Sequence, residues 1–182
     1  SDWGMGGTGG GVYHSMYDSF EWIQRFADPN FTYHAAQARV AALVVMRMAG
    51  AAVLPYDYAE FGRPLVPSVE RIDRAAAGKG WSLNTASLTV QLSALEAAGR
   101  AFNAARDSVL AATPAKGATA RANAQLMQVE RALTRPEGLR TRPWYRSLVY
   151  VADENNGYST MVFPSINEAI RSGDQALAQR EM

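Results

Sequence analysis

Apolar residues recur every three or four positions between Asn84 and Ala112, and this spacing constrains the fold more than any other feature of the sequence. The repeat consists of Leu88, Leu92, Leu95, Gly99, Phe102 and Val109. Such spacing draws one continuous apolar stripe along an α-helix. Asn84 or Thr85 can open this helix, and Thr113-Pro114 closes it. The stripe must be covered, either within the monomer or by a second copy of the chain.

Three shorter helices are expected around this long one. They span residues 69–77, residues 119–134, and a last stretch that begins at Phe163-Pro164-Ser165. Ser68 is the expected cap of the first of them, and Pro136 and Gly138 stop the second. Between the second and the third, Leu148–Val151 has the composition of one short strand, and residues 153–157 form a polar turn. The sequence therefore predicts a mainly α protein with an up-and-down helical bundle and one short strand segment.

The first 50 residues read as the tail of a different unit. Ser15 or Asp18 can cap a helix that runs to about Ala27, and a second helix is expected from about Thr32 to Gly50. Apolar residues lie on several faces of the second helix, so we expect it to be buried on several sides. His34, on that helix, is most simply a packed or hydrogen-bonded core histidine. The prolines and glycine of residues 55–67 mark turns and a boundary between two units.

Composition excludes several functional classes. The 182 residues are 48% hydrophobic, enough for one or two compact units, and the net charge of +1 gives no footprint for nucleic acid. The absence of cysteine excludes disulfides and a thiolate zinc site. No secretory signal is visible, and the longest apolar run, residues 40–54, is shorter than the ~20 residues that span a bilayer, so no membrane segment is expected in this chain.

His14 is one of only two histidines, and it follows the glycine run Gly9-Gly10-Gly11. A histidine presented from such a loop can be aimed outside its own segment, as metal ligands often are, although an ordinary loop histidine is the simpler interpretation. Gly4, Gly6 and Gly9 also fit the dinucleotide motif G-x-G-x-x-G, but too few residues precede Gly4 to form the strand that this motif requires. We therefore expect no nucleotide site. A chain that opens on such a loop is expected to be the C-terminal piece of a longer polypeptide.

Several motifs, in order, cover nearly the whole chain. They are Val12-Tyr13-His14-Ser15 followed by Tyr17-Asp18-Ser19, "FADPNFTYH" from Phe26, "VLPYDY" from Val53, "NAQLMQVERALTRPEGLRTRPWYRSLVY" from Asn123, Asn156-Gly157-Tyr158, and Phe163-Pro164. In these motifs the chain resembles the zinc exopeptidases of the glutamate carboxypeptidase II and transferrin receptor group.

The resemblance implies that residues 1–54 are the helical C-terminal end of an α/β peptidase domain. It also implies that residues 55–182 are the transferrin receptor-like helical dimerisation domain, lacking a last helix. His14 matches the last ligand of a two-zinc site, whose remaining ligands would lie outside this chain. The partners implied are a second copy, giving a homodimer, and a peptide substrate. Relatives of this group are mostly secreted or face outside the cytoplasm, which suggests a secreted or periplasmic protein.

Further site residues follow from the same resemblance. Tyr13 matches a cleft tyrosine that can hydrogen-bond the developing oxyanion, although a packed aromatic is the alternative. Tyr158, together with Asn156 and Gly157, matches the segment that holds the terminal carboxylate of the substrate in glutamate-specific members. Those members have a lysine where this chain has Gly157. A strong preference for C-terminal glutamate is therefore not expected, and both carboxypeptidase and aminopeptidase action stay open.

A noncatalytic receptor-like or assembly module of the same architecture is the competing hypothesis. His14 favours the enzyme, because a module without metals has no chemical reason to keep an imidazole at that position. A His-x-Asp pair, a bridging Asp and a Glu-Glu pair upstream of this chain would discriminate between the two hypotheses.

Overall fold

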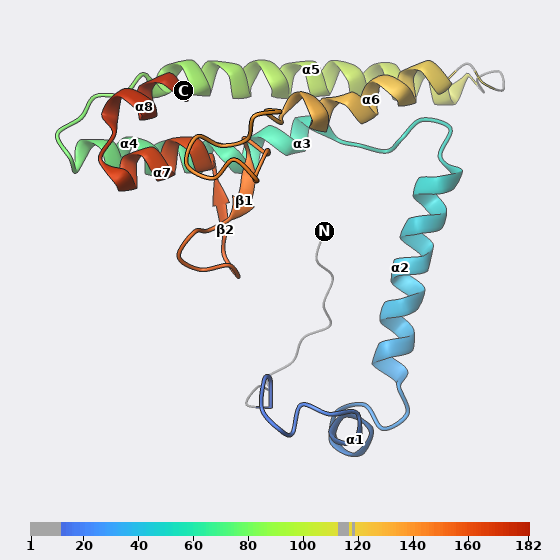
Figure 1. The fold of residues 1–182 in the computed structure, drawn as a ribbon. Coiled ribbons are helices and arrows are strands. Elements are labelled where there is room, and N and C mark those ends of the chain that lie inside the picture. Colours follow the sequence, from blue (N-terminus) through green and yellow to red (C-terminus); the bar gives the residue numbers. More distant parts are fainter. Residues whose placement is uncertain (1–11, 113–116, 118) are drawn as a thin grey trace. The chain divides into compact units, whose positions relative to one another are not determined.

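The computed structural model describes residues 12–112, 117 and 119–182, and it divides the chain into two compact units, Ser1–Ala51 and Ala52–Met182 (Figure 1). The protein is mainly α, as predicted. The glycine motif at residues 4–9 and the expected helix stop at Thr113-Pro114 lie outside the described residues. Among the helices that are described, none is long and apolar enough to cross a membrane.

The described part of unit 1 opens with a turn and the one-turn helix α1, Phe20–Trp22, which continues as a π-helical turn over Ile23–Ala27. The predicted caps, Ser15 and Asp18, are wrong. Ser19 is the N-cap, because its hydroxyl accepts a hydrogen bond from the Trp22 amide at 3.3 Å. Ser15 and Asp18 instead hold the turn that precedes the helix.

Helix α2 runs over Thr32–Gly50, as predicted. The N-cap residue is Phe31, and Asp28 ahead of it satisfies the first turn: one carboxylate oxygen accepts from the Thr32 amide at 2.8 Å and the other from the His34 amide at 3.0 Å. The expectation that α2 is buried on several sides is wrong for this chain, since none of its residues is buried. Its apolar side chains, such as Leu43 at 54% and Met46 at 69% exposure, lie open because no second layer of unit 1 covers them within the described residues.

Unit 2 starts with α3 (Tyr58–Gly62), a 3₁₀ turn (Arg63–Leu65) and α4 (Val66–Ala77), which follow one another without a break. Helix α5, Thr85–Ala111, returns alongside them, so that α3 and α4 pack against it (Figure 1). The predicted cap Ser68 is wrong. The helix begins two residues earlier with Pro67 in its first turn, and Ser68 is buried inside it, where its hydroxyl accepts from Arg71 at 2.7 Å.

The predicted stripe of α5 faces inward. Leu92 and Gly99 are buried, and Leu88, Leu95 and Phe102 are half-buried on the same face. Gly99 is required by close approach, because a Cβ there would lie 2.3 Å from the Ala59 amide nitrogen of α3. Val109, at 44% exposure, lies beyond the part that the chain itself covers. Most of the stripe is therefore satisfied within the monomer.

The C-terminal part adds small elements to the bundle. Helix α6 spans Ala120–Ala132, and the antiparallel strands β1 (Tyr150–Ala152) and β2 (Thr160–Val162) pair Val151 with Met161. The sequence predicted the first strand but not the second. The single last helix that was expected is instead two, α7 (Pro164–Ser172) and α8 (Gln175–Arg180). The break lies at Gly173, whose φ of 82° ends α7 in the left-handed conformation.

The core of unit 2 joins α4 to α7 and α8. Its buried members include Leu65, Val69 and Ile72 on the first side and Ile166 and Ile170 on the second. A smaller cluster joins Leu139 to Val151 and Met161 of the hairpin that β1 and β2 form.

One buried ion pair ties the loop after α6 to α7. Arg142 donates from Nε to the Glu168 carboxylate at 2.9 Å and from Nη2 to the carbonyl of Ala152, also at 2.9 Å. The Glu168 side chain is 1% exposed, so Arg142 supplies the charge that its burial requires.

Candidate functional site

The predicted ligand His14 lies in a hydrogen-bonded turn of unit 1. Its φ of 60° is left-handed, a conformation in which histidine is enriched among non-glycine residues. The Val12 carbonyl accepts from both the amide and the hydroxyl of Ser15, at 2.9 and 2.7 Å, and the His14 amide donates to Asp18 at 3.0 Å. Short-range hydrogen bonds therefore fix the backbone that carries the imidazole.

The rings of Tyr13 and His14 stack, with centroids 3.8 Å apart and planes 22° from parallel. Both residues are exposed, Tyr13 to 65%. The turn thus presents a phenol and an imidazole together at the surface of unit 1, and the imidazole is not packed into hydrocarbon.

A two-zinc site needs several carboxylates and imidazoles around each metal. Within residues 12–112, 117 and 119–182, no three His, Cys, Asp or Glu side chains lie close enough together to hold a metal ion. His14 is accessible and chemically suited as one ligand. A zinc site would therefore have to draw its other ligands from outside the part of the chain described here.

His34, the second histidine, has a local structural role. Its Nδ1 lies 2.6 Å from Asp28, whose side chain is 6% exposed, whereas the His34 side chain is 55% exposed. The predicted hydrogen bond is present, but the predicted core position is wrong, because no layer of the described part of unit 1 covers α2. Desolvation is the largest influence on the pKa of Asp28 and raises it, but hydrogen bonds from the His34 ring and from two backbone amides outweigh it and leave the pKa lowered.

Three other predicted residues, Asn156, Gly157 and Tyr158, lie in unit 2 on the loop between β1 and β2. The loop is closed by hydrogen bonds from the Asp153 amide to the Ser159 carbonyl and from the Ser159 amide to the Asn156 carbonyl, both 2.9 Å. The Asn156 side chain accepts from the Tyr158 amide at 3.1 Å. Tyr158 is 81% exposed, so the loop presents its ring on the surface of unit 2.

Gly157 leaves an open position beside Tyr158. A Cβ built on Gly157 meets no heavy atom within 4 Å, and its φ is not left-handed. A larger side chain, including a lysine, would fit there without strain. The surrounding structure therefore leaves room for a cationic side chain at this position, and the chain has glycine there instead.

The loop is also held by an ion pair that the sequence analysis missed. Arg171 of α7 donates to both oxygens of Asp153, at 2.7 and 3.1 Å, and to Glu154 at 3.3 Å. The hydrogen bond from Arg171, followed by that from the Asn155 amide, lowers the pKa of Asp153 to about 2. No spacing rule links residues 18 positions apart in different elements, so only the fold shows this contact.

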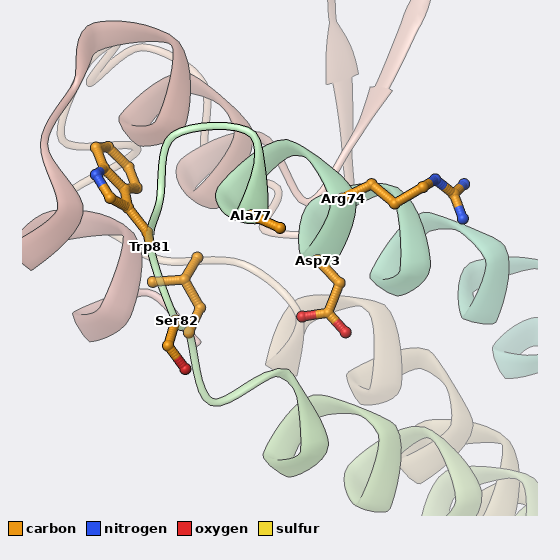
Figure 2. Close-up of a pocket in the computed structure, with 6 residues that line it drawn as sticks. Asp73, Arg74, Ala77, Trp81 and Ser82 are labelled. Carbon is orange, nitrogen blue, oxygen red and sulfur yellow. The ribbon is translucent and has the colours of Figure 1, made fainter.

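A shallow hollow lies beside the connection between α4 and α5 (Figure 2). Asp73 and Trp81 line it, and Figure 2 shows that the Arg74 side chain extends away from Trp81. Asp73 is already engaged, because it accepts from the Thr85 hydroxyl at 2.8 Å. None of the predicted site residues lines this hollow.

Residues 83–182 match the family described as the transferrin receptor-like dimerisation domain. The match begins at the end of the α4–α5 connection and includes α5, α6, the hairpin and the two last helices.

Named relatives cover most of the chain. A protein named probable glutamate carboxypeptidase LAMP1, from Arabidopsis thaliana, is 33% identical over 164 residues, which are 90% of this chain and 23% of the relative. Probable glutamate carboxypeptidase AMP1 of the same plant is 32% identical over 87% of the chain and 23% of its own length. Aminopeptidase NAALADL1 of Rattus norvegicus is 25% identical over 93% of the chain and 24% of its own length. The chain thus spans about a quarter of the length of these relatives.

Proposed function

This chain belongs to the transferrin receptor-like dimerisation domain family, and we propose that it is the C-terminal part of a di-zinc exopeptidase that hydrolyses peptides. Relatives named as carboxypeptidases and as an aminopeptidase match it over most of its length, and that match carries the peptidase class. The observation that carries the metal role is the fixed, left-handed turn that exposes the His14 imidazole.

In this proposal His14 is one zinc ligand and Tyr13 acts beside it. Bound zinc would supply an activated water and polarise the scissile carbonyl. The Tyr13 phenol, stacked on the His14 ring, would donate a hydrogen bond to the oxyanion that develops on the substrate. Because the residues that the structure describes bring together too few ligands to hold zinc, we expect no activity from this chain in isolation.

The loop that bears Asn156, Gly157 and Tyr158 would contact the end of the peptide. Support comes from the exposure of Tyr158 and from the hydrogen bonds that order its backbone. With Gly157 in place of a cation, the loop provides no ammonium for a substrate carboxylate. Terminal glutamate is then not strongly favoured over alanine or leucine.

The substitution Gly157→Lys tests this specificity. The side chain enters open space, so the fold should be kept. In the intact protein, a charge-assisted contact worth about 1.5–3 kcal/mol should raise kcat/KM for Glu-ended peptides by about ten- to a hundredfold relative to Leu-ended ones. Gly157→Met is the matched control of similar length without charge. An equal gain in both variants would contradict the proposed carboxylate contact.

We assign residues 1–54 to the end of the peptidase domain and residues 55–182 to the dimerisation domain. The exposed apolar surface of α2 supports this assignment, because a helix of 19 residues with apolar side chains on several faces and none buried needs a covering layer from elsewhere. The division of the chain between Ala51 and Ala52 is also close to the proposed boundary.

Helix α5 also supports a homodimer. Opposite its inward stripe it has a second row of small apolar residues, all exposed, which comprises Val90, Ala94, Ala97, Ala101 and Ala104. Small side chains let a second helix approach closely, and a two-fold pairing requires such a self-complementary patch. We place the dimer contact on this row. Ala97→Glu combined with Ala101→Glu should yield monomers by analytical ultracentrifugation, whereas Gln91→Glu combined with Ser93→Glu, on the flanks, should not.

The zinc content of the intact protein tests the central claim. His14→Ala should lower the zinc bound per subunit from about two ions towards one and abolish peptide hydrolysis. His34→Ala is the control, since that ring is engaged with Asp28 and should leave zinc unchanged. An intact protein that binds no zinc would instead favour the noncatalytic assembly module.

A further inference from the structure

We propose that Arg171 is a positioning residue, which holds the loop of residues 153–159 against α7 and thereby sets Tyr158 for the substrate. This inference rests on the proposed substrate role of that loop. It adds a residue that has no part in the family motifs given above and that would act without touching the peptide.

The contact has the geometry of a strong ion pair. The two terminal nitrogens of Arg171 face the two oxygens of Asp153 in a fork, at 2.7 and 3.1 Å. The Asp153 side chain is 15% exposed and that of Arg171 44%, so water screens the pair only in part. Glu154, 3.3 Å from the same guanidinium, adds a second carboxylate.

Helix α7 provides a rigid base for this contact. Six of its nine residues are buried, among them Glu168, Ala169 and Ile170, so packing within unit 2 fixes the helix. Four residues before Arg171, and therefore on the same side of the helix, Asn167 donates to the Val162 carbonyl at the end of β2 at 2.7 Å. The helix thus holds the hairpin at two points, one at the end of a strand and one at the loop.

Removal of Arg171 would leave two adjacent carboxylates without their shared cation. Asp153 also orders the loop from within, because it accepts from the Asn155 amide at 2.8 Å while its own amide bonds the Ser159 carbonyl. Repulsion between Asp153 and Glu154 would therefore loosen the segment that carries Tyr158.

The test uses the intact protein and compares Arg171→Met, Arg171→Lys and Arg63→Met. Met keeps the aliphatic stem without charge, and Lys restores the charge but not the fork. Arg63 is the matched control, since it is paired with Glu60 at 2.6 Å on the surface of the same unit, outside the hairpin. Hydrogen exchange of residues 153–159 and steady-state kinetics on dipeptides are measured for each variant, and Tyr158→Ala serves as the reference for loss of the substrate contact.

We expect Arg171→Met to speed exchange in the loop and to raise KM, each by about two- to fivefold, with kcat unchanged. Arg171→Lys should recover part of both effects, and Arg63→Met should show neither. If Tyr158→Ala raises KM while Arg171→Met does not, the positioning role is wrong and the proposed function stands. If Tyr158→Ala leaves KM unchanged, the substrate role of the loop is wrong. Hydrogen exchange in Arg171→Met alone then decides whether Arg171 orders the loop. Unchanged exchange in that variant overturns the positioning proposal.

Discussion

Units 1 and 2 differ in where their apolar side chains lie. Unit 2 buries a connected core in which α4, α7 and α8 meet. Among the described residues of unit 1, Asp28 alone is buried, although α2 is rich in valine, leucine and methionine. The comparison shows that apolar side chains on a helix do not form a core by themselves. A second layer from the same unit must cover them.

The pattern of each long helix explains this difference. In α5 the large apolar residues lie on one face, and α3 and α4 run back along that face. In α2 they surround the helix, as Val40, Leu43 and Val45 do, and no single partner layer could bury them all. Unit 2 can therefore close on itself, whereas unit 1 is suited to being one layer within a larger domain.

The largest effect is expected where unit 2 buries charge. Arg142→Met leaves Glu168 buried without its cation and should lower the free energy of unfolding by about 3–5 kcal/mol in urea denaturation. Arg100→Met, which breaks an exposed pair with Glu96, should cost less than about 1 kcal/mol. Equal costs would show that unit 2 does not depend on this contact.

A matched pair of leucines compares the two long helices directly. Leu92→Ala in α5 removes a side chain that is 7% exposed and should cost about 2–3 kcal/mol in this chain. Leu43→Ala in α2, 54% exposed, should cost less than about 0.5 kcal/mol. In the intact protein the Leu43 cost should rise towards that of Leu92. If it does not, α2 is not covered by a peptidase domain.

Asp28 tests whether unit 1 is ordered by local bonds instead of by a core. Asp28→Ala removes the acceptor for the Thr32 and His34 amides and should reduce the helical circular dichroism of a peptide spanning residues 12–51. Asp18→Ala, which affects only the turn before α1, should leave that signal nearly unchanged. The loss of stability caused by Asp28→Ala should be smaller than that caused by Leu92→Ala in unit 2.

The smallest expected effect is the loss of stability at acid pH. The folded pKa of Asp153 is lowered from 3.8 to about 2, so its contribution to stability is fully present above pH 4 and is lost as the pH falls through 2. Carboxyl NMR should show Asp153 titrating near the lower value, and near its ordinary value in Arg171→Met. A pKa near the ordinary value in the unchanged protein would contradict the ion pair.

Local patterns predicted the helices well and their ends less well. The expected ranges of α2, α5 and α6 agree closely with the observed helices, whereas Ser68 and Ser15 are not caps, because several polar residues near each start could serve. The strand β2 was missed, since three residues between a loop and a helix carry too little pattern. For the site, His14 and Tyr158 came from resemblance, and their roles stay predictions.

The sequence by itself determined the mainly α fold, the long helix with its apolar stripe, and the residues with suitable chemistry. These properties depend on neighbours three or four positions apart along the chain. Only the tertiary structure decided that Gly99 must lack a side chain, that Glu168 is buried on Arg142, and that Arg171 reaches Asp153. Each of these depends on the distance between residues far apart in sequence, which chain folding sets and local spacing does not encode.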